Sequence, residues 1–271
     1  MSPPIKLIST DFDGTLFEEY GKPPIPKRVL TLIGDLQERG AKWVINTGRN
    51  LSSLMEGLTQ AEVSIRPDYL VLVEREIHVN EGSRFVGLAE WNAACTRDHA
   101  ELFARVRPDL PHLTGWVNTR FSAKVYEDAY SPFCLIAGNN GDADMIHDFL
   151  NDYCSRVPKL TVVRNDVYAR FSHADFNKGT ALGEITRHLG LQPSQVFAAG
   201  DWLNDLPMLD KRFAHFLAAP SNAVEAVKQT VRRQKGFVSE HSHGDGVADA
   251  LEFVCLRTSR ENQRLSLPVV E

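Results

Sequence analysis

The stretch LISTDFDGTLF, residues 7–17, joins an apolar segment to two aspartates, Asp11 and Asp13, that lie two positions apart. Residues 5–10 are apolar with β-branched members and lead to Gly14, which predicts a buried strand followed by a loop. Two like charges about 4 Å apart repel by on the order of 1 kcal/mol in water and by roughly 4 kcal/mol at an effective dielectric of about 20. A strand that ends on this pair therefore needs a neighbouring group that neutralises it.

The segments after this stretch alternate between helix and strand patterns. A helical apolar face at 24–40 leads to a second buried strand at 41–49, a short helix at 51–60 and a third strand at 69–74. Parallel strands need crossover connections, which are usually helices. The order of segments therefore predicts an open parallel sheet with crossover helices.

After residue 75 the pattern changes to strand pairs separated by helices. The predicted elements are a hairpin at 76–88, a helix at 89–106 that ends before Pro108, two strands within 121–138, a helix at 142–157 and a strand pair at 160–172 that turns at Asn165 and Asp166. Strand pairs that are consecutive in the chain favour an antiparallel sheet. We predict a compact α+β module inserted between two halves of the parallel sheet.

The alternation of helix and strand returns near residue 178. The predicted elements are a helix at 178–190, a strand at 195–201, a helix at 206–211, a short strand at 215–219 and a helix at 222–231. Residues 258–271 carry no clear pattern. The predicted fold class is α/β, with a Rossmann-like open parallel sheet core and an inserted α+β domain.

The composition is that of an ordinary globular protein. Hydrophobic residues make up 43% of the 271 residues, and the formal net charge of -5 offers no field for holding a polyanion. The basic run at 231–235 continues an amphipathic helix, and we interpret it as an exposed helix face. We therefore expect no nucleic acid partner.

Two further features concern the compartment. The four cysteines, Cys95, Cys134, Cys154 and Cys255, are scattered and form no CxxC pair, which is typical of a reducing compartment. No signal segment precedes the first strand, and no apolar run approaches the ~18 residues that a membrane span needs. We expect a cytoplasmic protein without a membrane partner, and the sequence carries no indication of its oligomeric state.

Polar residues gather where the predicted parallel strands end. Asp11 and Asp13 follow the first strand, Thr47 follows the second, and Asp201 and Asp205 follow a later one. Ligands of open parallel sheets bind beyond the carboxyl ends of the strands, so we expect these side chains at one place. Carboxylates without nearby Cys or His favour a hard cation, and Mg²⁺ suits oxygen ligands together with a substrate phosphate. The sequence therefore predicts a magnesium site.

The same residues suit phosphoryl transfer. One carboxylate can attack phosphorus and form an aspartyl-phosphate, while the second protonates the leaving alcohol and later takes a proton from water. Thr47, the backbone N–H of Gly48, and Lys178 at the start of a predicted helix are candidates to contact the phosphoryl oxygens. We expect a small-molecule phosphate ester as the substrate.

Four short motifs follow one another along the chain. They are DFDGTL at 11–16, NTGR at 46–49, KGTAL at 178–182 and GDWLNDLPML at 200–209. In this order they resemble the signature motifs of the haloacid dehalogenase superfamily, and the arrangement is most similar to its Cof-type sugar-phosphatase branch. The trailing segments SNAVEAVK and GDGVADALE resemble the same branch, whereas the middle of the chain matches it only in its strand and helix pattern.

The resemblance implies a role for the residues of the first three motifs. Asp11 would be the nucleophile and a side-chain ligand of Mg²⁺. Asp13 would be the acid and base, and would bind the metal through its backbone carbonyl. Thr47 and Lys178 would hold the phosphoryl group, and Lys178 would also balance the charge of Asp11.

The last motif would complete the site. The resemblance implies that Asp201 is a metal ligand, that Asp205 acts on the metal directly or through water, and that Asn204 helps to orient the phosphate. It also implies a discontinuous hydrolase core at 1–82 and 175–271. Residues 83–174 would form a cap that closes over this core, selects the substrate and excludes water.

Three positions depart from the pattern of this branch. Glu74 and Arg75 stand where an Asn-Gly pair is usual, which alters the wall of the pocket. Trp202 fills a slot that is commonly small or polar, and it is a candidate to narrow the entrance.

The run HSHGDG at 241–246 contains good metal ligands, but we interpret it as a polar loop that enters the last helix.

The function predicted from these residues is a Mg²⁺-dependent phosphatase. It would hydrolyse a small phosphorylated metabolite, in the first place a sugar phosphate, through an aspartyl-phosphate intermediate. A phosphomutase is one alternative, and it would return the phosphoryl group to the substrate. A dehalogenase needs no metal and would leave Asp13, Asp201 and Asp205 without a neutralising cation. The alternative outside enzymes is a binding or regulatory protein that retains the fold.

Overall fold

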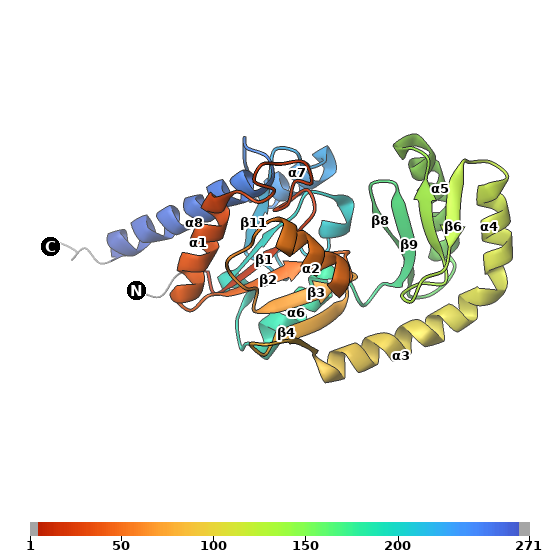
Figure 1. The fold of residues 1–271 in the computed structure, drawn as a ribbon, viewed down its shortest axis with the longest axis horizontal. Coiled ribbons are helices and arrows are strands. Elements are labelled where there is room, and N and C mark those ends of the chain that lie inside the picture. Colours follow the sequence, from red (N-terminus) through yellow and green to blue (C-terminus); the bar gives the residue numbers. More distant parts are fainter. Residues whose placement is uncertain (1–4, 266–271) are drawn as a thin grey trace.

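The computed structural model describes residues 5–265, and for 257–265 it describes the backbone alone. Two sheets organise the chain (Figure 1): an eight-stranded sheet in the order β12-β11-β10-β1-β2-β3-β4-β5 and a four-stranded sheet in the order β6-β7-β9-β8. Among residues 5–265, no helix has the length and apolar character needed to cross a membrane. A mostly parallel core sheet with a second, inserted sheet confirms the predicted fold class.

Parallel strands form the centre of the larger sheet. They are β1 (Leu7–Thr10), β2 (Lys42–Asn46), β3 (Tyr69–Leu72), β10 (Val196–Ala199), β11 (Phe216–Ala219) and β12 (Phe237–Val238). β1 pairs with β2 on one side and with β10 on the other, and every residue of β1 is buried. A strand buried on both faces needs a continuous apolar run, as in the predicted segment 5–10. The carboxyl ends of β1, β2 and β10 therefore lie at one edge of the sheet.

Helices cover both faces of this sheet. One hydrophobic cluster includes side chains of α1 (Lys27–Glu38), α2 (Leu51–Gln60) and α8 (His243–Leu265), and the other includes side chains of α6 (Lys178–His188) and α7 (Glu225–Arg233). The buried residues of α1 recur at helical spacing along one side of the helix. Both faces of the sheet are thereby covered by helices. A binding site is therefore expected beyond the carboxyl ends of the strands.

The hairpin predicted at 76–88 extends the core sheet. β4 (Glu76–Asn80) pairs antiparallel with β3, and β5 (Phe85–Gly87) pairs antiparallel with β4. β5 lies past the predicted domain limit at residue 83 and still belongs to the larger sheet. We therefore propose that the chain divides into a core and an inserted cap, and that the cap begins after β5 and ends before α6.

The smaller sheet and three helices make up this cap. Its strands are β6 (Ala123–Tyr126), β7 (Cys134–Ala137), β8 (Leu160–Asn165) and β9 (Tyr168–His173), and its helices are α3 (Ala89–Val106), α4 (Leu110–Asn118) and α5 (Asn140–Ser155). One cluster of buried side chains joins these helices to the sheet. β8 and β9 lie on the side of the cap nearest the core (Figure 1).

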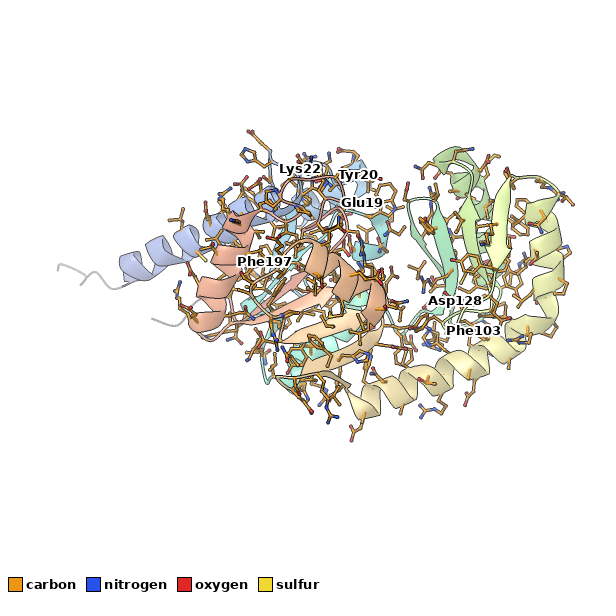
Figure 2. All side chains as sticks on the ribbon, viewed as in Figure 1. Glu19, Tyr20, Lys22, Phe103, Asp128 and Phe197 are labelled. Atoms are coloured by element: carbon orange, nitrogen blue, oxygen red, sulfur yellow. The ribbon has the colours of Figure 1, made fainter. Side chains whose placement is uncertain are left out.

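A cavity of about 510 Å³ lies between α3 and residues 127–132, with Phe103 and Asp128 in its wall (Figure 2).

The prediction of a helix at 206–211 is wrong. A short 3-10 helix covers Leu203–Asp205 instead, and the residues after it form turns. Pro207 has no N–H to donate, and so short a segment does not form a stable helix by itself. The backbone turns at this point because the carbonyl of Asp205 accepts from the N–H of Met208 at 2.9 Å.

Two elements lie outside the predicted pattern, and a third is longer than expected. α4 follows Pro108 closely and carries a proline in its first turn, where the missing N–H is not needed. β12 is too short to give a periodic signal. α8 continues to Leu265, into the segment 258–271 that showed no clear pattern, and residues 266–271 lie outside the described residues.

Candidate active site

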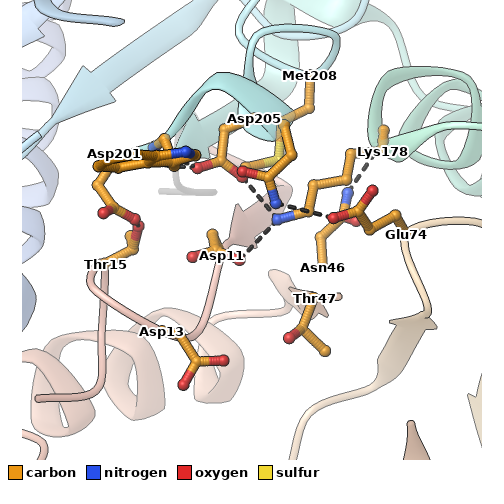
Figure 3. A network of polar contacts seen from close by, with 12 residues as sticks. Asp11, Asp13, Thr15, Asn46, Thr47, Glu74, Lys178, Asp201, Asp205 and Met208 are labelled. Atoms are coloured by element: carbon orange, nitrogen blue, oxygen red, sulfur yellow. Dashed lines mark hydrogen bonds and ion pairs between the residues drawn. The ribbon is translucent and has the colours of Figure 1, made fainter. Parts of the chain in front are cut away.

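Lys178 bridges two buried carboxylates at the carboxyl end of β1. Its side chain is 0% exposed, and its Nζ donates to Asp11 Oδ1 and to Asp205 Oδ1, each at 2.6 Å (Figure 3). Lys178 is the first residue of α6, whose start is capped by the Asn177 side chain as it accepts from the N–H of Thr180. The helix start therefore delivers the ammonium group to carboxylates from two other segments.

The loop after β10 supplies Asp201 and Asp205. Asp205 Oδ2 accepts from the backbone N–H groups of Asp201 and Trp202, each at 2.9 Å, so this side chain fixes the loop that carries it. Thr15 Oγ1 donates to Asp201 Oδ1 at 2.7 Å. Gly14 has a φ of +76°, and a Cβ there would meet Asp201 Oδ2 at 2.4 Å, so the close approach requires glycine. The loops after β1 and β10 thus fit directly against each other.

Three of the predicted carboxylates form a group that suits a metal ion. Asp11, Asp201 and Asp205 each place an oxygen within 4.8 Å of the others, and all three residues are buried. Carboxylate oxygens are the donors that hard divalent cations prefer. When all three carboxylates are ionised, Lys178 supplies only one positive charge to balance them. The remaining buried negative charge is energetically costly unless another cation neutralises it. The residues present therefore fit a bound cation.

Burial dominates the proton affinity of this group. It raises the pKa of Asp11 well above the usual range, and the charges of Asp205 and Asp201 add to the rise while Lys178 opposes it. Burial also raises the pKa of Asp201 to about 7, with a further rise from Asp205 and an opposing effect of Thr15. Burial alone would lower the pKa of Lys178, but Asp11 and Asp205 outweigh it and raise that pKa. One lysine does not balance three ionised carboxylates, so in the absence of a cation the raised pKa values of Asp11 and Asp201 favour their protonated forms.

The carboxylate of Asp13 lies outside this group. It forms an ion pair with Arg49, with Nε 2.8 Å from Oδ2 and Nη2 2.5 Å from Oδ1. The Arg49 guanidinium also lies over the rings of Phe12 and Phe17, with Cζ 5.0 and 5.3 Å from the ring centroids. Arg49 is absent from the predicted site although it ends the NTGR motif. The ion pair holds the Asp13 side chain at the wall of the cleft described below.

Thr47, Gly48 and Asn204 lie around the carboxylate group. Thr47 is fully buried, and its Oγ1 accepts from the backbone N–H of Arg49 at 3.1 Å. Gly48 and Glu74 both line the cleft, and Asn204 Nδ2 donates to Glu74 Oε1 at 2.8 Å. The predicted phosphate-binding residues therefore lie on the same side of the core as the carboxylates.

Thr15, Asn46 and Arg49 also belong to the site, and the sequence analysis did not single them out. Asn46 Nδ2 donates to the carbonyl of Lys178 at 3.0 Å and so fixes the start of α6. Thr15, Asn46 and Arg49 belong to the motifs DFDGTL and NTGR, so the motifs themselves were the available signal. For Glu74 the only signal in the sequence was its departure from the pattern of the branch.

A cleft of about 620 Å³ separates the core site from the cap. Asp11, Asp13, Gly48, Arg49 and Glu74 line its core side, and Tyr126, Tyr168 and Arg170 line its cap side. Along β9, residues 168 and 170 alternate with two residues of the hydrophobic cluster of the cap, so they belong to its other face. The cap thus offers aromatic rings and a guanidinium to whatever enters the cleft.

The positions that depart from the family pattern have separate surroundings. Glu74 lines the cleft, as expected for a pocket wall. Arg75 lines the smaller cavity beside α3 instead, and its side chain is buried. The backbone N–H of Trp202 contacts Asp205, and its indole Nε1 is buried without a hydrogen-bond partner among residues 5–265.

The run HSHGDG at 241–246 was expected to be a polar loop, but only residues 241–242 precede α8, and residues 243–246 form its first turn. His243 is the first residue of the helix, and its Nδ1 lies 3.7 Å from Glu18 Oε2. His241 Nδ1 lies 2.7 Å from Asp249 Oδ2. The histidines therefore have carboxylate partners of their own.

The comparison with protein families identifies the chain. Residues 8–73 and 117–251 match the family model described as haloacid dehalogenase-like hydrolase. The chain therefore belongs to the haloacid dehalogenase-like hydrolases. Within that superfamily it is a Cof-type phosphatase, a phosphoric monoester hydrolase, which confirms the resemblance of the motifs.

Individual relatives cover nearly the whole chain. A 5-amino-6-(5-phospho-D-ribitylamino)uracil phosphatase of Bacillus subtilis is 27% identical over 251 residues, 91% of this chain and 94% of the relative. A phosphoglycolate phosphatase of Methanothermobacter thermautotrophicus is 22% identical over 249 residues, 91% of this chain and 97% of the relative. The X-ray structure of a Synechocystis sucrose-phosphatase in complex with sucrose and phosphate superposes with a TM-score of 0.69 at 18% identity, covering 92% and 97% of the two chains. At that identity the superposition shows a shared fold.

Proposed function

We propose that this protein is a Mg²⁺-dependent phosphatase that hydrolyses a small sugar phosphate through an aspartyl-phosphate intermediate. The observation that carries the proposal is the contact of Lys178 with Asp11 and Asp205, each at 2.6 Å, beside a cleft of about 620 Å³. A cleft of this size suits a small metabolite. The family match supports phosphate-ester hydrolysis as the reaction.

In the first half of the reaction, Asp11 is the nucleophile. Because Lys178 holds Oδ1, we assign the attack on phosphorus to Oδ2. The new O–P bond forms as the ester P–O bond breaks, and the carboxyl group of Asp13 gives its proton to the leaving alcohol oxygen. Thr47, the backbone N–H of Gly48, and Lys178 stabilise the charge on the phosphoryl oxygens.

In the second half, water replaces the enzyme carboxylate on phosphorus. The ionised Asp13 takes a proton from the attacking water, the bond between phosphorus and Asp11 breaks, and inorganic phosphate leaves. Asp13 lies at the cleft wall with 39% of its side chain exposed. Its ion pair with Arg49 favours the ionised form, which suits the base of this second half, and the pair has to open for Asp13 to carry the proton of the first half. Release of inorganic phosphate distinguishes this reaction from that of a phosphomutase.

Asp11, Asp201 and Asp205 are the side chains that would hold Mg²⁺, together with the backbone carbonyl of Asp13. Both oxygens of Asp205 already accept hydrogen bonds, so Asp201 is a stronger candidate than Asp205 for direct contact. When bound, the cation would neutralise the carboxylates and polarise a phosphoryl oxygen.

The relatives support a sugar or polyol phosphate as the substrate. The Bacillus subtilis relative acts, by its name, on a phosphate carried by a ribityl chain, and the Synechocystis structure holds sucrose and phosphate. Tyr126, Tyr168 and Arg170 on the cap side of the cleft suit the ring and oxygen atoms of such a leaving group.

A phosphate-release screen tests the proposal. Purified protein with Mg²⁺ is assayed on sugar, polyol and nucleotide phosphates and on a small chromogenic phosphate ester, with and without a chelator. We expect release of inorganic phosphate that the chelator abolishes, with sugar or polyol phosphates preferred. No hydrolysis of any ester would contradict the proposal.

The variant Asp11→Asn tests the nucleophile. An amide does not attack phosphorus, so we expect kcat to fall by on the order of a thousandfold or more with the fold retained, as judged by circular dichroism. Asp35→Asn, on the exposed side of α1, is the matched control. Equal activity of Asp11→Asn and the parent protein would exclude the aspartyl-phosphate.

A further inference from the structure

Glu74 lies in a strained turn between β3 and β4. Val73 has a φ of +45° and Glu74 a φ of +68°, both in the left-handed region that favours glycine. Such residues are energetically costly, a β-branched one most of all, and they persist only where surrounding structure requires them. Val73 and Glu74 are two such residues in succession, and they lie beside the carboxylate group. We infer that the strained turn persists because it places the Glu74 side chain at the site.

The backbone around the turn explains how it is held. The N–H of Glu74 donates to the carbonyl of Thr47 at 2.9 Å, and the N–H of Val73 donates to the carbonyl of Arg49 at 3.0 Å. The turn is thereby fastened to the loop that carries Gly48. As a result, Glu74 Oε1 lies 3.2 Å from the position that a Cβ on Gly48 would take.

The carboxylate of Glu74 fixes the amide of Asn204. Asn204 is 8% exposed, and its Nδ2 donates to Glu74 Oε1 at 2.8 Å. An ionised carboxylate only accepts hydrogen bonds, so the amide turns its N–H side towards Glu74. Asn204 Oδ1 is buried, and residues 5–265 offer it no hydrogen-bond partner. The orientation of this amide therefore depends on Glu74.

We propose that Glu74 is a positioning residue for Asn204. By accepting one N–H of Nδ2, Glu74 directs the second N–H at a phosphoryl oxygen of the bound substrate. This inference rests on the proposed function, in which Asn204 orients the phosphate. Because Glu74 acts as an acceptor, an amide oxygen at the same place serves the same purpose, whereas a methyl group does not.

A purely structural role for Glu74 has different consequences. If Glu74 only tied the turn to the loop after β10, its loss would lower thermal stability and leave the affinity for phosphate unchanged. Two measurements therefore distinguish the positioning role from the structural role. They are the affinity for inorganic phosphate and the energetic coupling between Glu74 and Asn204 in a double-mutant cycle.

The test uses the full chain with Mg²⁺ and the variants Glu74→Gln, Glu74→Ala, Asn204→Ala and the double variant of the two alanine changes. Each is measured for KM and kcat with a chromogenic phosphate ester and for the Kd of inorganic phosphate by titration calorimetry. We expect each alanine variant to raise KM and Kd about tenfold, the double variant to match them without further loss, and Glu74→Gln to stay within about threefold of the parent protein.

Glu62 provides a matched control. It is also a glutamate with positive φ, +50°, and it lies in the loop after α2, away from the cleft. The change Glu62→Ala removes a glutamate side chain from a similar backbone conformation. We expect its KM and Kd to equal those of the parent protein.

Each outcome decides between the roles. Parent-like phosphate affinity in Glu74→Ala, equal losses in Glu74→Gln and Glu74→Ala, or additive losses in the double variant would each overturn the positioning role. A parent protein that binds phosphate but hydrolyses no ester overturns the proposed function instead, and the phosphate affinities still decide the role of Glu74. A parent protein that binds no phosphate overturns both.

Discussion

Lys178 and Arg75 are two buried cations of the core with different surroundings. Lys178 is 0% exposed, and its ammonium group contacts the carboxylates of Asp11 and Asp205. Arg75 is 5% exposed, and its guanidinium contacts neutral oxygens. One cation is therefore matched by charge, and the other by hydrogen bonds alone.

The neutral contacts of Arg75 connect the core with the cap. Its Nη2 donates to the carbonyl of Tyr130 at 2.6 Å and its Nη1 to Ser172 Oγ at 3.5 Å, while Trp91 Nε1 donates to the carbonyl of Arg75 at 2.7 Å. Burial lowers the pKa of Arg75, whereas the carboxylates raise the pKa of Lys178 against the effect of burial. The two cations therefore differ in what they stabilise: Lys178 neutralises buried acids, and Arg75 fastens the cap to the core.

The largest effect is expected for Lys178→Met. This change leaves Asp11 and Asp205 without their cation, and removal of one partner of a buried ion pair costs about 3–5 kcal/mol. We expect the free energy of unfolding to fall by that amount and phosphatase activity to be lost. Urea denaturation and phosphate release measure the two effects.

Lys159→Met is the matched control for that variant. Lys159 pairs with Asp175 at 2.7 Å, but 55% and 53% of the two side chains are exposed. Exposed ion pairs contribute about 0–1 kcal/mol, so we expect little change in stability. Equal losses in the two lysine variants would contradict the importance of burial.

A smaller effect is expected for Arg75→Met. The change removes hydrogen bonds to the cap but leaves no carboxylate without a partner, so we expect a loss of about 1–2 kcal/mol of stability. Hydrolysis of a small chromogenic ester should persist, because Arg75 lines the cavity beside α3 and not the cleft at Asp11. A stability loss as large as that of Lys178→Met would remove the distinction between the two cations.

The smallest effect concerns His99, which lies next to Arg75 in the cavity wall. Burial lowers the pKa of His99 to about 3, and the charge of Arg75 lowers it further. Between the unfolded value of 6.5 and about 3, the unfolded chain binds the additional proton, so the folded protein loses stability as the pH falls. Between about pH 6.5 and 5.5 we expect the parent protein to lose on the order of 1 kcal/mol more than His99→Gln.

Urea denaturation at the two pH values checks this prediction. The difference between the parent protein and His99→Gln isolates the histidine from the carboxylates, which titrate in both. Parallel stability curves would show that His99 is not held neutral in the folded protein.

Local patterns predicted much of the core. The helices at 51–60 and 89–106 match α2 and α3, because their apolar spacing and end signals lie within the segments themselves. The convergence of Asp11, Asp201 and Asp205 was also predictable, since parallel strands end at one edge of a sheet. Their roles in catalysis stay predictions until the variants are measured.

Contacts between distant segments were beyond the reach of these patterns. Glu74 and Asn204 are 130 positions apart, and neither carries a sign of the other. The burial of Arg75 depends in the same way on where the cap strands lie. The error at 206–211 has a local origin, because Pro207 has no N–H to donate and the carbonyl of Asp205 accepts from the N–H groups of Met208 and Leu209 in a turn.

The chain by itself specified the core sheet, the order of its motifs and the group of acids at the strand ends, because periodicity and chain order are properties of single segments. Packing in three dimensions specified that Asp13 faces Arg49, that Glu74 faces Asn204, and that the cap brings Tyr126 and Arg170 to the cleft. Those contacts depend on the relative placement of whole elements, which no one segment encodes.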